Sequence, residues 1–290
     1  MGSRLSAPGP QEKRFAAYIE GLAKAAGHED RQAPLKNYCK GLLLPGERKS
    51  IEPMAARLDS ENVQAMRQSL HHLVAKAPWS DDVLLEQVRT YVLPAMEKHG
   101  PVVAWIVDDT GFPKKGKHSV GVTRQYCGQV GKQENCRVAV SLSVATWSSS
   151  LPVEYRLYLP KEWAEDSERR EKTEVPEEVE FQTKPAIALD QIRAAVTANL
   201  DRGVVLADAA YGINTEFRDG LTALDLQYVV GCAEFHDSLG ARQTAFARQA
   251  TRKNGKTSAA VTAVYRPPTC LGEAVSDESA HHCLPGNHLA

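Results

Sequence analysis

Two adjacent aspartates follow an apolar run in the stretch Trp105-Ile106-Val107-Asp108-Asp109-Thr110-Gly111-Phe112-Pro113-Lys114-Lys115-Gly116. Residues 102–107 are mostly β-branched or aromatic, and Pro101 and Gly111 bound them, so they predict a short buried strand. Two carboxylates at the end of a buried strand lose hydration, and a divalent cation or a proton usually compensates for that loss. The aspartate pair therefore predicts a site of chemistry where this strand ends.

The composition is that of an ordinary globular protein. The chain has 290 residues, enough for one large core or two smaller ones, with 42% hydrophobic and 24% charged residues. No apolar run approaches the roughly 20 residues that cross a membrane, and residues 1–10 lack the apolar part of a signal peptide. The 6 cysteines include no C-x-x-C pair, which argues against a zinc module or a disulfide framework. We expect a cytoplasmic protein without a membrane partner.

The charges are unevenly distributed along the chain. A net charge of −1 is not the basic excess that is typical of nucleic-acid-binding proteins. Locally, however, Lys114, Lys115, Lys117 and Arg124 follow the aspartates, whereas residues 162–180 are strongly acidic. Such a basic stretch can hold a phosphate backbone over a metal site, or it can be the solvated face of a hairpin. From the charges alone, the solvated face of a hairpin is favoured over a phosphate-binding stretch.

The hydrophobic period divides the chain into three parts. Residues 12–100 show helical spacing, for example at Phe15, Tyr18, Ile19 and Leu22, and predict a helical N-terminal domain over residues 1–100. Strands at 120–127, 136–147 and 153–159 then form a meander, followed by a helix at 185–200, a strand at 203–208, a helix around 217–224 and a strand at 228–230. Residues 232–290 lack an apolar period and predict a poorly ordered tail without a final helix. The predicted fold class is α+β.

Asp208 ends the second apolar strand of this pattern, Gly203-Val204-Val205-Leu206-Ala207-Asp208. If this strand lies beside the one that precedes Asp108 and Asp109, the carboxylates converge at one edge of the sheet. They would then form a hard oxygen site suited to Mg²⁺ or Mn²⁺, as two-metal phosphoryl transfer requires, and a third acid normally completes such a site. Each aspartate taken alone is as readily explained as a residue that caps a turn.

The residues from Phe15 to Gly231 resemble the insertion-sequence transposases of the DDE superfamily, in the branch described as DDE superfamily endonucleases. The resemblance is carried by four stretches, at residues 41–50, 105–117, 119–128 and 205–212. Among them are Gly41-Leu42-Leu43-Leu44-Pro45-Gly46-Glu47-Arg48-Lys49-Ser50 and Val205-Leu206-Ala207-Asp208-Ala209-Ala210-Tyr211-Gly212. Several of these stretches are long and specific, and together they span most of the chain.

This resemblance implies a ribonuclease-H-like fold at residues 101–231, with one catalytic acid after strand one and a second after strand four. Asp108 is favoured as the first acid because Thr110 follows two positions later, and Asp109 is the alternative. Asp208 matches the second acid, in a D-x-x-Y-G context. The family's cut-and-paste chemistry implies Mg²⁺ held by three acids, with N-terminal helices that help to bind transposon ends. Phosphate contacts are expected from Lys114, Lys115, Lys117 and Arg124.

The expected partners follow from the same resemblance. They are double-stranded DNA, as transposon ends and as target, and a second copy of the chain in a homodimer. The location expected from this resemblance is the bacterial cytoplasm, with association with the nucleoid when the protein is bound to DNA.

The chain departs from the family pattern at the third acid. In relatives this acid is a glutamate on a helix near the C-terminus, and Glu234, Glu273 and Glu278 do not lie in a stretch of that kind. The resemblance is expected to end at Gly231, as in a truncated or frame-shifted chain. We therefore expect an incomplete ribonuclease-H-like domain that is inactive alone, because both metal ions depend on the third ligand.

Two other functions are compatible with parts of the sequence. Asp109-Thr110-Gly111 matches the D-T-G of aspartic proteases, but the motif is short, and a homodimer would be needed because no second copy occurs. A non-catalytic fragment that binds transposon ends is the stronger alternative. His281-His282-Cys283 lacks a fourth metal ligand. Tyr211 and Trp147 are expected to pack in the interior rather than stack on bases.

Overall fold

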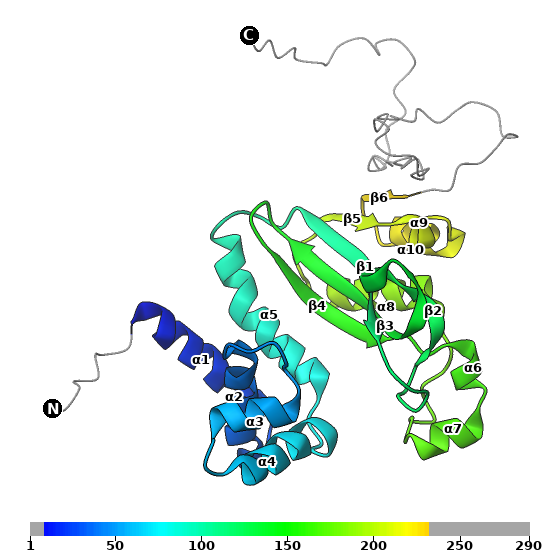
Figure 1. Ribbon diagram of the computed structural model, residues 1–290. Coiled ribbons are helices and arrows are strands. Elements are labelled where there is room, and N and C mark those ends of the chain that lie inside the picture. The colour runs from blue at the N-terminus through cyan, green and yellow to red at the C-terminus, as the bar shows by residue number, and fades with distance from the viewer. Residues whose placement is uncertain (1–8, 232–290) are drawn as a thin grey trace, which may run out of the picture.

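The computed structural model describes residues 9–231, so the predicted tail at 232–290 lies outside the described residues. Five helices come first, as the sequence predicts, and Figure 1 shows them gathered beside a sheet that is built from later residues. They are α1 (Pro10–Ala25), α2 (Glu29–Leu43), α3 (Ile51–Leu58), α4 (Val63–Ala75) and α5 (Asp81–Glu97). None of the helices at residues 9–231 is both long enough and apolar enough to span a bilayer.

The first and last of these helices begin at recognisable capping residues. Pro10 occupies the first turn of α1, and the Glu12 carboxylate accepts the Gly9 backbone N–H at 2.8 Å. Ser80 caps α5, since its hydroxyl accepts the Val83 N–H at 3.4 Å. Part of the predicted apolar stripe of α1 is buried, and it packs against residues of α2 and α4. This cluster consists of Ile19, Leu22, Ala26, Leu35 and Leu73.

The remaining chain forms a mixed six-stranded sheet with the order β2-β3-β1-β5-β6, and β4 also pairs with β3. Its strands are β1 (Ala104–Pro113), β2 (Thr123–Cys127), β3 (Lys132–Ala145), β4 (Ser150–Leu157), β5 (Val204–Ala207) and β6 (Tyr228–Val230). Strand β1 is antiparallel to β3 and parallel to β5, and β6 is parallel to β5. The predicted antiparallel strands and the two later strands are present, and the α+β fold class is confirmed. The predicted meander is wrong, because the long strand β3, not β2, pairs with β1.

Strand β1 is longer than the sequence pattern indicates. It was expected to end before Asp108, but it continues to Pro113, with Asp108 opposite Ser141 and Asp109 opposite Val140 on β3. That boundary was wrong because the 14-residue strand β3 supplies backbone hydrogen-bond partners well beyond the apolar run. On the other side of β1, pairing with β5 stops at Ile106. The aspartates therefore lie within a strand that has lost one of its two neighbours.

Helix α8 (Lys184–Thr197) covers one face of the sheet (Figure 1). The Thr183 hydroxyl caps it by accepting the Ala186 N–H at 3.3 Å. Its buried residues join a core with the inward side chains of β1, β3 and β5, among them Trp105, Val107, Leu142, Ile187, Ile192 and Val205. The buried Gln191 amide donates to the Val140 carbonyl at 3.0 Å. This hydrogen bond fixes the position of α8 along β3.

The acidic connector between β4 and α8 contains two short helices, α6 (Lys161–Ala164) and α7 (Ser167–Lys172). After β5, the short helices α9 (Ala209–Gly212) and α10 (Thr215–Ala223) lead to β6. Tyr211 is buried in the core, as predicted. The prediction for Trp147 was wrong, because its side chain is 87% exposed. Trp147 lies in the tight turn after β3, where the Thr146 hydroxyl accepts the N–H groups of Ser148 and Ser149 and the indole projects into solvent.

Candidate active site

Asp108 and Asp208 lie at the same level of two neighbouring parallel strands. Ala104 pairs with Val204 and Ile106 with Leu206, so each aspartate stands two residues beyond the last pair. Neighbouring strands are about 4.8 Å apart, and residues in register on parallel strands share a face. Both side chains are exposed. The expectation that the two strands lie side by side is therefore met, and Asp108 lies within β1 beside the point where β5 ends.

The two carboxylates are held by different local structure. Asp208 is the N-cap of α9, where its Oδ1 accepts the N–H groups of Ala210 at 2.9 Å and Tyr211 at 3.4 Å. The Oδ1 of Asp108 accepts the Asp109 N–H at 2.7 Å, and the Ser141 hydroxyl donates to the Asp108 carbonyl at 3.3 Å. Within residues 9–231, neither carboxylate has an ion-pair partner. Each carboxylate therefore retains oxygen atoms that can bind a cation or accept a further hydrogen bond.

Asp109 points to the other face of β1, because side chains alternate along a strand and Asp109 pairs with the core residue Val140. That face carries α8, whose first residue, Lys184, forms an ion pair with the Asp109 carboxylate. The Lys184 ammonium also lies 5.6 Å from the centroid of the Tyr158 ring. The sequence analysis missed Lys184. The available signal was a lone lysine within the acidic residues 174–190.

The buried Tyr211 hydroxyl is within electrostatic reach of all three acids. Its pKa is raised above the ordinary value, first by burial and then by the negative charges of Asp109, Asp208 and Asp108, in that order. The hydroxyl makes no hydrogen bond among the described residues. All three carboxylates thus lie within electrostatic reach of one phenol, although Asp208 is about a hundred residues from the other two in the chain.

The two exposed carboxylates in register are hard oxygen donors of the kind that Mg²⁺ and Mn²⁺ prefer, so Asp108 and Asp208 fit part of a divalent-cation site. Across residues 9–231, no group of three or more His, Cys, Asp or Glu side chains is arranged to hold a metal. The acids considered further downstream, Glu234, Glu273 and Glu278, lie outside the described residues. The described part of the site therefore supplies two carboxylates.

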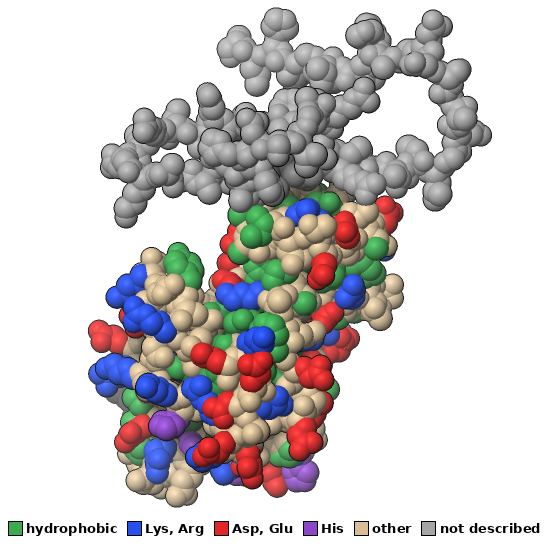
Figure 2. Space-filling model, turned by 90° about the vertical axis from the view of Figure 1, so that its right-hand side faces the viewer, with side chains coloured by type: hydrophobic (Ala, Val, Ile, Leu, Met, Phe, Trp, Pro, Cys, Tyr) green, Lys and Arg blue, Asp and Glu red, His purple; other side chains and the backbone are tan. Residues whose placement is uncertain are grey.

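The basic residues lie on the loop that follows β1 and on β2. Lys114, Lys115, Lys117 and Arg124 are all exposed, and within residues 9–231 none of them is in an ion pair. At about 3.3 Å per residue, Lys114 is about 20 Å along the strand from Asp108. Figure 2 shows acidic and basic side chains interspersed on the face that it presents, in keeping with the net charge of −1. The basic residues are thus available to a ligand that extends beyond the aspartates.

Contacts from distant residues hold this basic loop in place. The Asn135 amide donates to the carbonyls of Lys114 at 2.7 Å and Gly116 at 2.8 Å. From the acidic connector, the Arg169 guanidinium donates to the Lys117 carbonyl at 2.7 Å, and the buried Trp163 indole donates to the Val122 carbonyl at 2.8 Å. The acidic connector therefore supports the basic loop through these two side chains.

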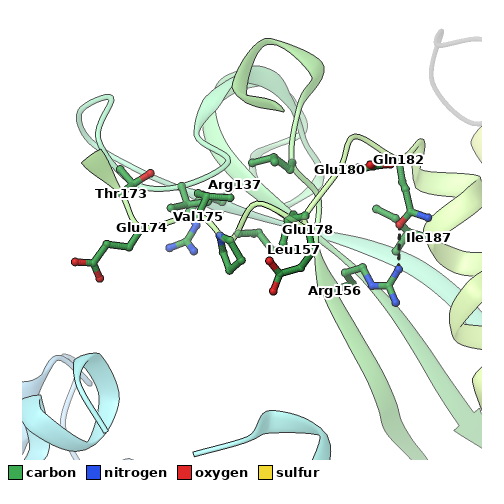
Figure 3. Close-up of a pocket in the computed structure, with 14 residues that line it drawn as sticks. Arg137, Arg156, Leu157, Thr173, Glu174, Val175, Glu178, Glu180, Gln182 and Ile187 are labelled. Atoms are coloured by element: carbon green, nitrogen blue, oxygen red, sulfur yellow. Dashed lines mark hydrogen bonds between the residues drawn. The ribbon is translucent and has the colours of Figure 1, made fainter. Parts of the chain in front are cut away.

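A cavity of about 720 Å³ lies beside the site, between the acidic connector and β4 (Figure 3). Arg137, Arg156, Glu178 and Gln182 are among its lining residues, but Asp108, Asp109 and Asp208 are not. Gln182 stands two residues before Lys184 and accepts a hydrogen bond from Arg156 at 3.0 Å, the dashed line in Figure 3. The aspartates thus lie outside the lining of the cavity, which includes residues on both sides of Lys184.

Gly111 of the D-T-G sequence has a structural role. A Cβ at this position would lie 2.7 Å from the Cys127 sulfur and 3.0 Å from the Cys127 Cα, so only glycine lets β1 approach β2 this closely. Asp109 is paired with Lys184. Aspartic proteases instead use two aspartates that share a proton. The D-T-G sequence is therefore explained by the close packing of Gly111 against β2 and by the ion pair of Asp109 with Lys184.

The DDE superfamily endonuclease family matches residues 21–282 of the chain. The matched span continues past Gly231, where the resemblance was expected to end. The chain is also 29% identical over 191 residues to the "Probable transposase for insertion sequence element IS701" of Microchaete diplosiphon. That alignment covers 66% of this chain and 46% of the relative, so the chain spans about half the length of the curated relative that it matches.

Proposed function

The chain belongs to the DDE superfamily endonuclease family, and from this we propose that it acts in cut-and-paste DNA transposition. Its reaction would be hydrolysis of phosphodiester bonds at transposon ends, followed by transfer of the freed 3′ strand to target DNA. The observation that supports this proposal best is the register that brings Asp108 and Asp208 to the same level of β1 and β5. The similarity to a probable insertion-sequence transposase points to the same activity.

In this proposal Asp108 and Asp208 hold Mg²⁺ or Mn²⁺, with Asp109 as the alternative to Asp108. When bound, such an ion polarises the phosphodiester and stabilises charge on the attacking and leaving oxygens. Asp108 is exposed and in register with Asp208, whereas Asp109 faces α8 and is paired with Lys184. These contacts favour Asp108 as the ligand. The Asp208 carboxylate is oriented by the first N–H groups of α9.

Double-stranded DNA is the proposed substrate, as transposon ends and as target. Lys114, Lys115, Lys117 and Arg124 are exposed and would contact the backbone phosphates next to the cleaved bond. The domain at residues 1–100 would help to bind the transposon ends, and the domain at 101–231 would carry the two acids. A homodimer would bring two ends together, which strand transfer requires.

We further propose that the chain is catalytically incomplete when alone. Asp108 and Asp208 supply two of the three acids that the family chemistry requires, and Glu234, Glu273 and Glu278 do not lie in a sequence stretch like the one that carries the third acid in relatives. In that case the protein would bind transposon ends without cutting them. Binding without cleavage is the second candidate function.

The test is divalent-cation-dependent nicking of a supercoiled plasmid that carries the two ends of the element. Three proteins are compared: the present chain, Asp208→Asn, and a version extended by the C-terminal glutamate helix of a relative. We expect nicking by the extended chain only, and retention of end binding by all three. Because Asn keeps the size and the capping oxygen of Asp208, any nicking by the present chain that this substitution abolishes would depend on the charge of Asp208.

Two results would contradict parts of this proposal. Robust nicking by the present chain that Asp208→Asn abolishes would show that it is complete as it stands. Failure of the extended chain to nick in Mg²⁺ or Mn²⁺, although it is folded and binds the ends, would count against the transposase mechanism itself.

A further inference from the structure

Lys184 lies beside the aspartates although it is 75 residues from Asp109 in the sequence. Its ammonium is held by the Asp109 carboxylate and by the face of the Tyr158 ring, 5.6 Å away. A lysine ammonium has three N–H donors, and within residues 9–231 only Asp109 accepts one of them. The side chain is 28% exposed. Its remaining donors can therefore reach a ligand on the α8 face of β1.

The segment that carries Lys184 is fixed on both sides. Figure 3 shows Gln182 beside Arg156, whose guanidinium donates to the side-chain Oε1 of Gln182 at 3.0 Å. The Gln182 amide donates in turn to the Asp190 carboxylate of α8 at 2.9 Å. Phe181 packs edge-on against Tyr158, with ring centroids 6.4 Å apart. Lys184 is thus presented by a braced segment at the start of α8, which limits the entropy lost when its ammonium binds a ligand.

The charges at the site leave a role for this ammonium. Asp108 and Asp208 are exposed acids that would repel a DNA phosphate, and the basic loop begins about 20 Å away along β1. Lys184 neutralises Asp109 and offers further donors on the α8 face of β1, the face opposite the one that carries Asp108 and Asp208. An ammonium that is held in place by one carboxylate can donate to a phosphodiester oxygen at the same time.

We propose that Lys184 binds a phosphodiester oxygen of the DNA where the strand passes the α8 face of β1, next to the part held at Asp108 and Asp208, and that Asp109 positions its ammonium. This inference rests on the proposed function and deepens it. It makes Lys184 a phosphate-binding residue, and it makes Asp109 a positioning residue rather than a metal ligand. Asp108 and Asp208 then form the pair that holds the cation.

The first experiment measures affinity for a duplex that carries the transposon end, by fluorescence anisotropy over a range of NaCl concentrations. We expect Lys184→Met to weaken binding by about tenfold and to lower the slope of log K against log salt by about 0.9, the loss of one phosphate contact. Lys184→Arg should retain most of the affinity because it keeps the charge and donors. Lys172→Met is the matched control, since it removes a lysine that pairs only with Glu168 on the surface of α7.

The second experiment replaces the phosphates next to the cleaved bond, one at a time, by a neutral methylphosphonate, which tests the contact in the wild-type protein. We expect the wild type to lose about five- to tenfold in affinity for one of these duplexes, and Lys184→Met to lose almost nothing further on that duplex. An unchanged salt slope for Lys184→Met would overturn the proposal. So would an equal loss of affinity on methylphosphonate substitution in both proteins.

Mn²⁺ binding, followed by electron paramagnetic resonance, separates this inference from the proposed function. We expect Asp109→Asn to keep the Mn²⁺ affinity within about twofold and Asp108→Asn or Asp208→Asn to lower it by about tenfold or more. If Asp109→Asn lowers the affinity as much as the other two, the positioning role of Asp109 is refuted. If neither Asp108→Asn nor Asp208→Asn has an effect, the proposed acid pair fails, and the DNA measurements still decide whether Lys184 contacts phosphate.

Discussion

Asp108 and Asp208 stand at one level of the sheet, each two residues past the last backbone pair that joins their strands, Ile106 with Leu206. The strand that carries Asp108 continues, because β3 pairs with it as far as Pro113. The strand that carries Asp208 stops at Ala207, and its carboxylate caps the helix that follows. One acid is therefore held by a ladder of hydrogen bonds and the other by a helix N-terminus, so substitutions at the two positions have different structural consequences.

At Asp208, two substitutions separate its charge from its cap. Asp208→Asn keeps an oxygen that accepts the Ala210 N–H, so we expect little change in stability. Asp208→Ala removes this acceptor and should lower the free energy of unfolding by about 1 kcal/mol. Urea denaturation of both variants checks this. Equal destabilisation by Asn and Ala would show that the cap contributes nothing.

Trp163→Phe should disturb the basic loop, because Trp163 supports it from the acidic connector. The substitution removes the indole N–H that donates to the Val122 carbonyl in a buried contact. We expect a loss of about 1 to 2 kcal/mol in stability and weaker binding of DNA, because the loop that carries Lys117 loses support. Trp147→Phe is the matched control, since that side chain is exposed in a turn. Similar effects of the two substitutions would contradict the prediction.

Arg89 joins the N-terminal helices to the sheet. From α5 it donates to the Glu154 carboxylate at 2.6 Å and to the Val153 carbonyl at 3.0 Å, and burial raises the pKa of Glu154 despite this partner. Arg89→Met leaves a half-buried carboxylate unpaired, so we expect a loss of about 2 kcal/mol in the free energy of unfolding. Lys172→Met, which breaks an exposed pair, should cost less than about 0.5 kcal/mol. Denaturant titration distinguishes the two.

Gly212 lies where α9 meets the end of β6. An added Cβ would come within 1.9 Å of the Gly231 carbonyl oxygen, so the backbone must move to accept any side chain. We expect Gly212→Ala to destabilise the protein by about 2 to 3 kcal/mol. Gly128→Ala is the control, since a Cβ there would meet no atom within 4 Å. Thermal unfolding should show a clear loss for the first variant and almost none for the second.

Cys136 gives the protein a predicted alkaline sensitivity. Burial, and then the neighbouring Cys127, raise its pKa from 9.0 to about 11. The thiol therefore ionises first in the unfolded chain, so its contribution to stability is constant below about pH 9 and falls as the pH rises from 9 to 11. Urea denaturation at pH 8 and pH 10.5 measures this loss. The loss should be smaller in Cys136→Ala, and an identical loss in both proteins would contradict the assignment.

Much of the architecture could be predicted from local patterns. The helical spacing of Ile19 and Leu22, the β-branched run before Asp108 and the apolar strand before Asp208 identify their elements because each pattern extends over neighbouring residues. The length of β1 could not be predicted in this way. Its backbone partners beyond Val107 come from β3, which begins about 25 residues later, so the continuation depends on a long-range pairing.

The sequence by itself determined the α+β class, the order of the elements and the acids Asp108, Asp109 and Asp208, since residue type and spacing record those features directly. The tertiary structure decided which residues meet. It set the register that aligns Asp108 with Asp208, turned Asp109 toward α8, and brought Lys184 to it across 75 residues of chain. The physical reason is that strand register and helix docking are fixed by hydrogen bonds and packing between distant segments, such as that of Gln191 with Val140, which local patterns do not encode.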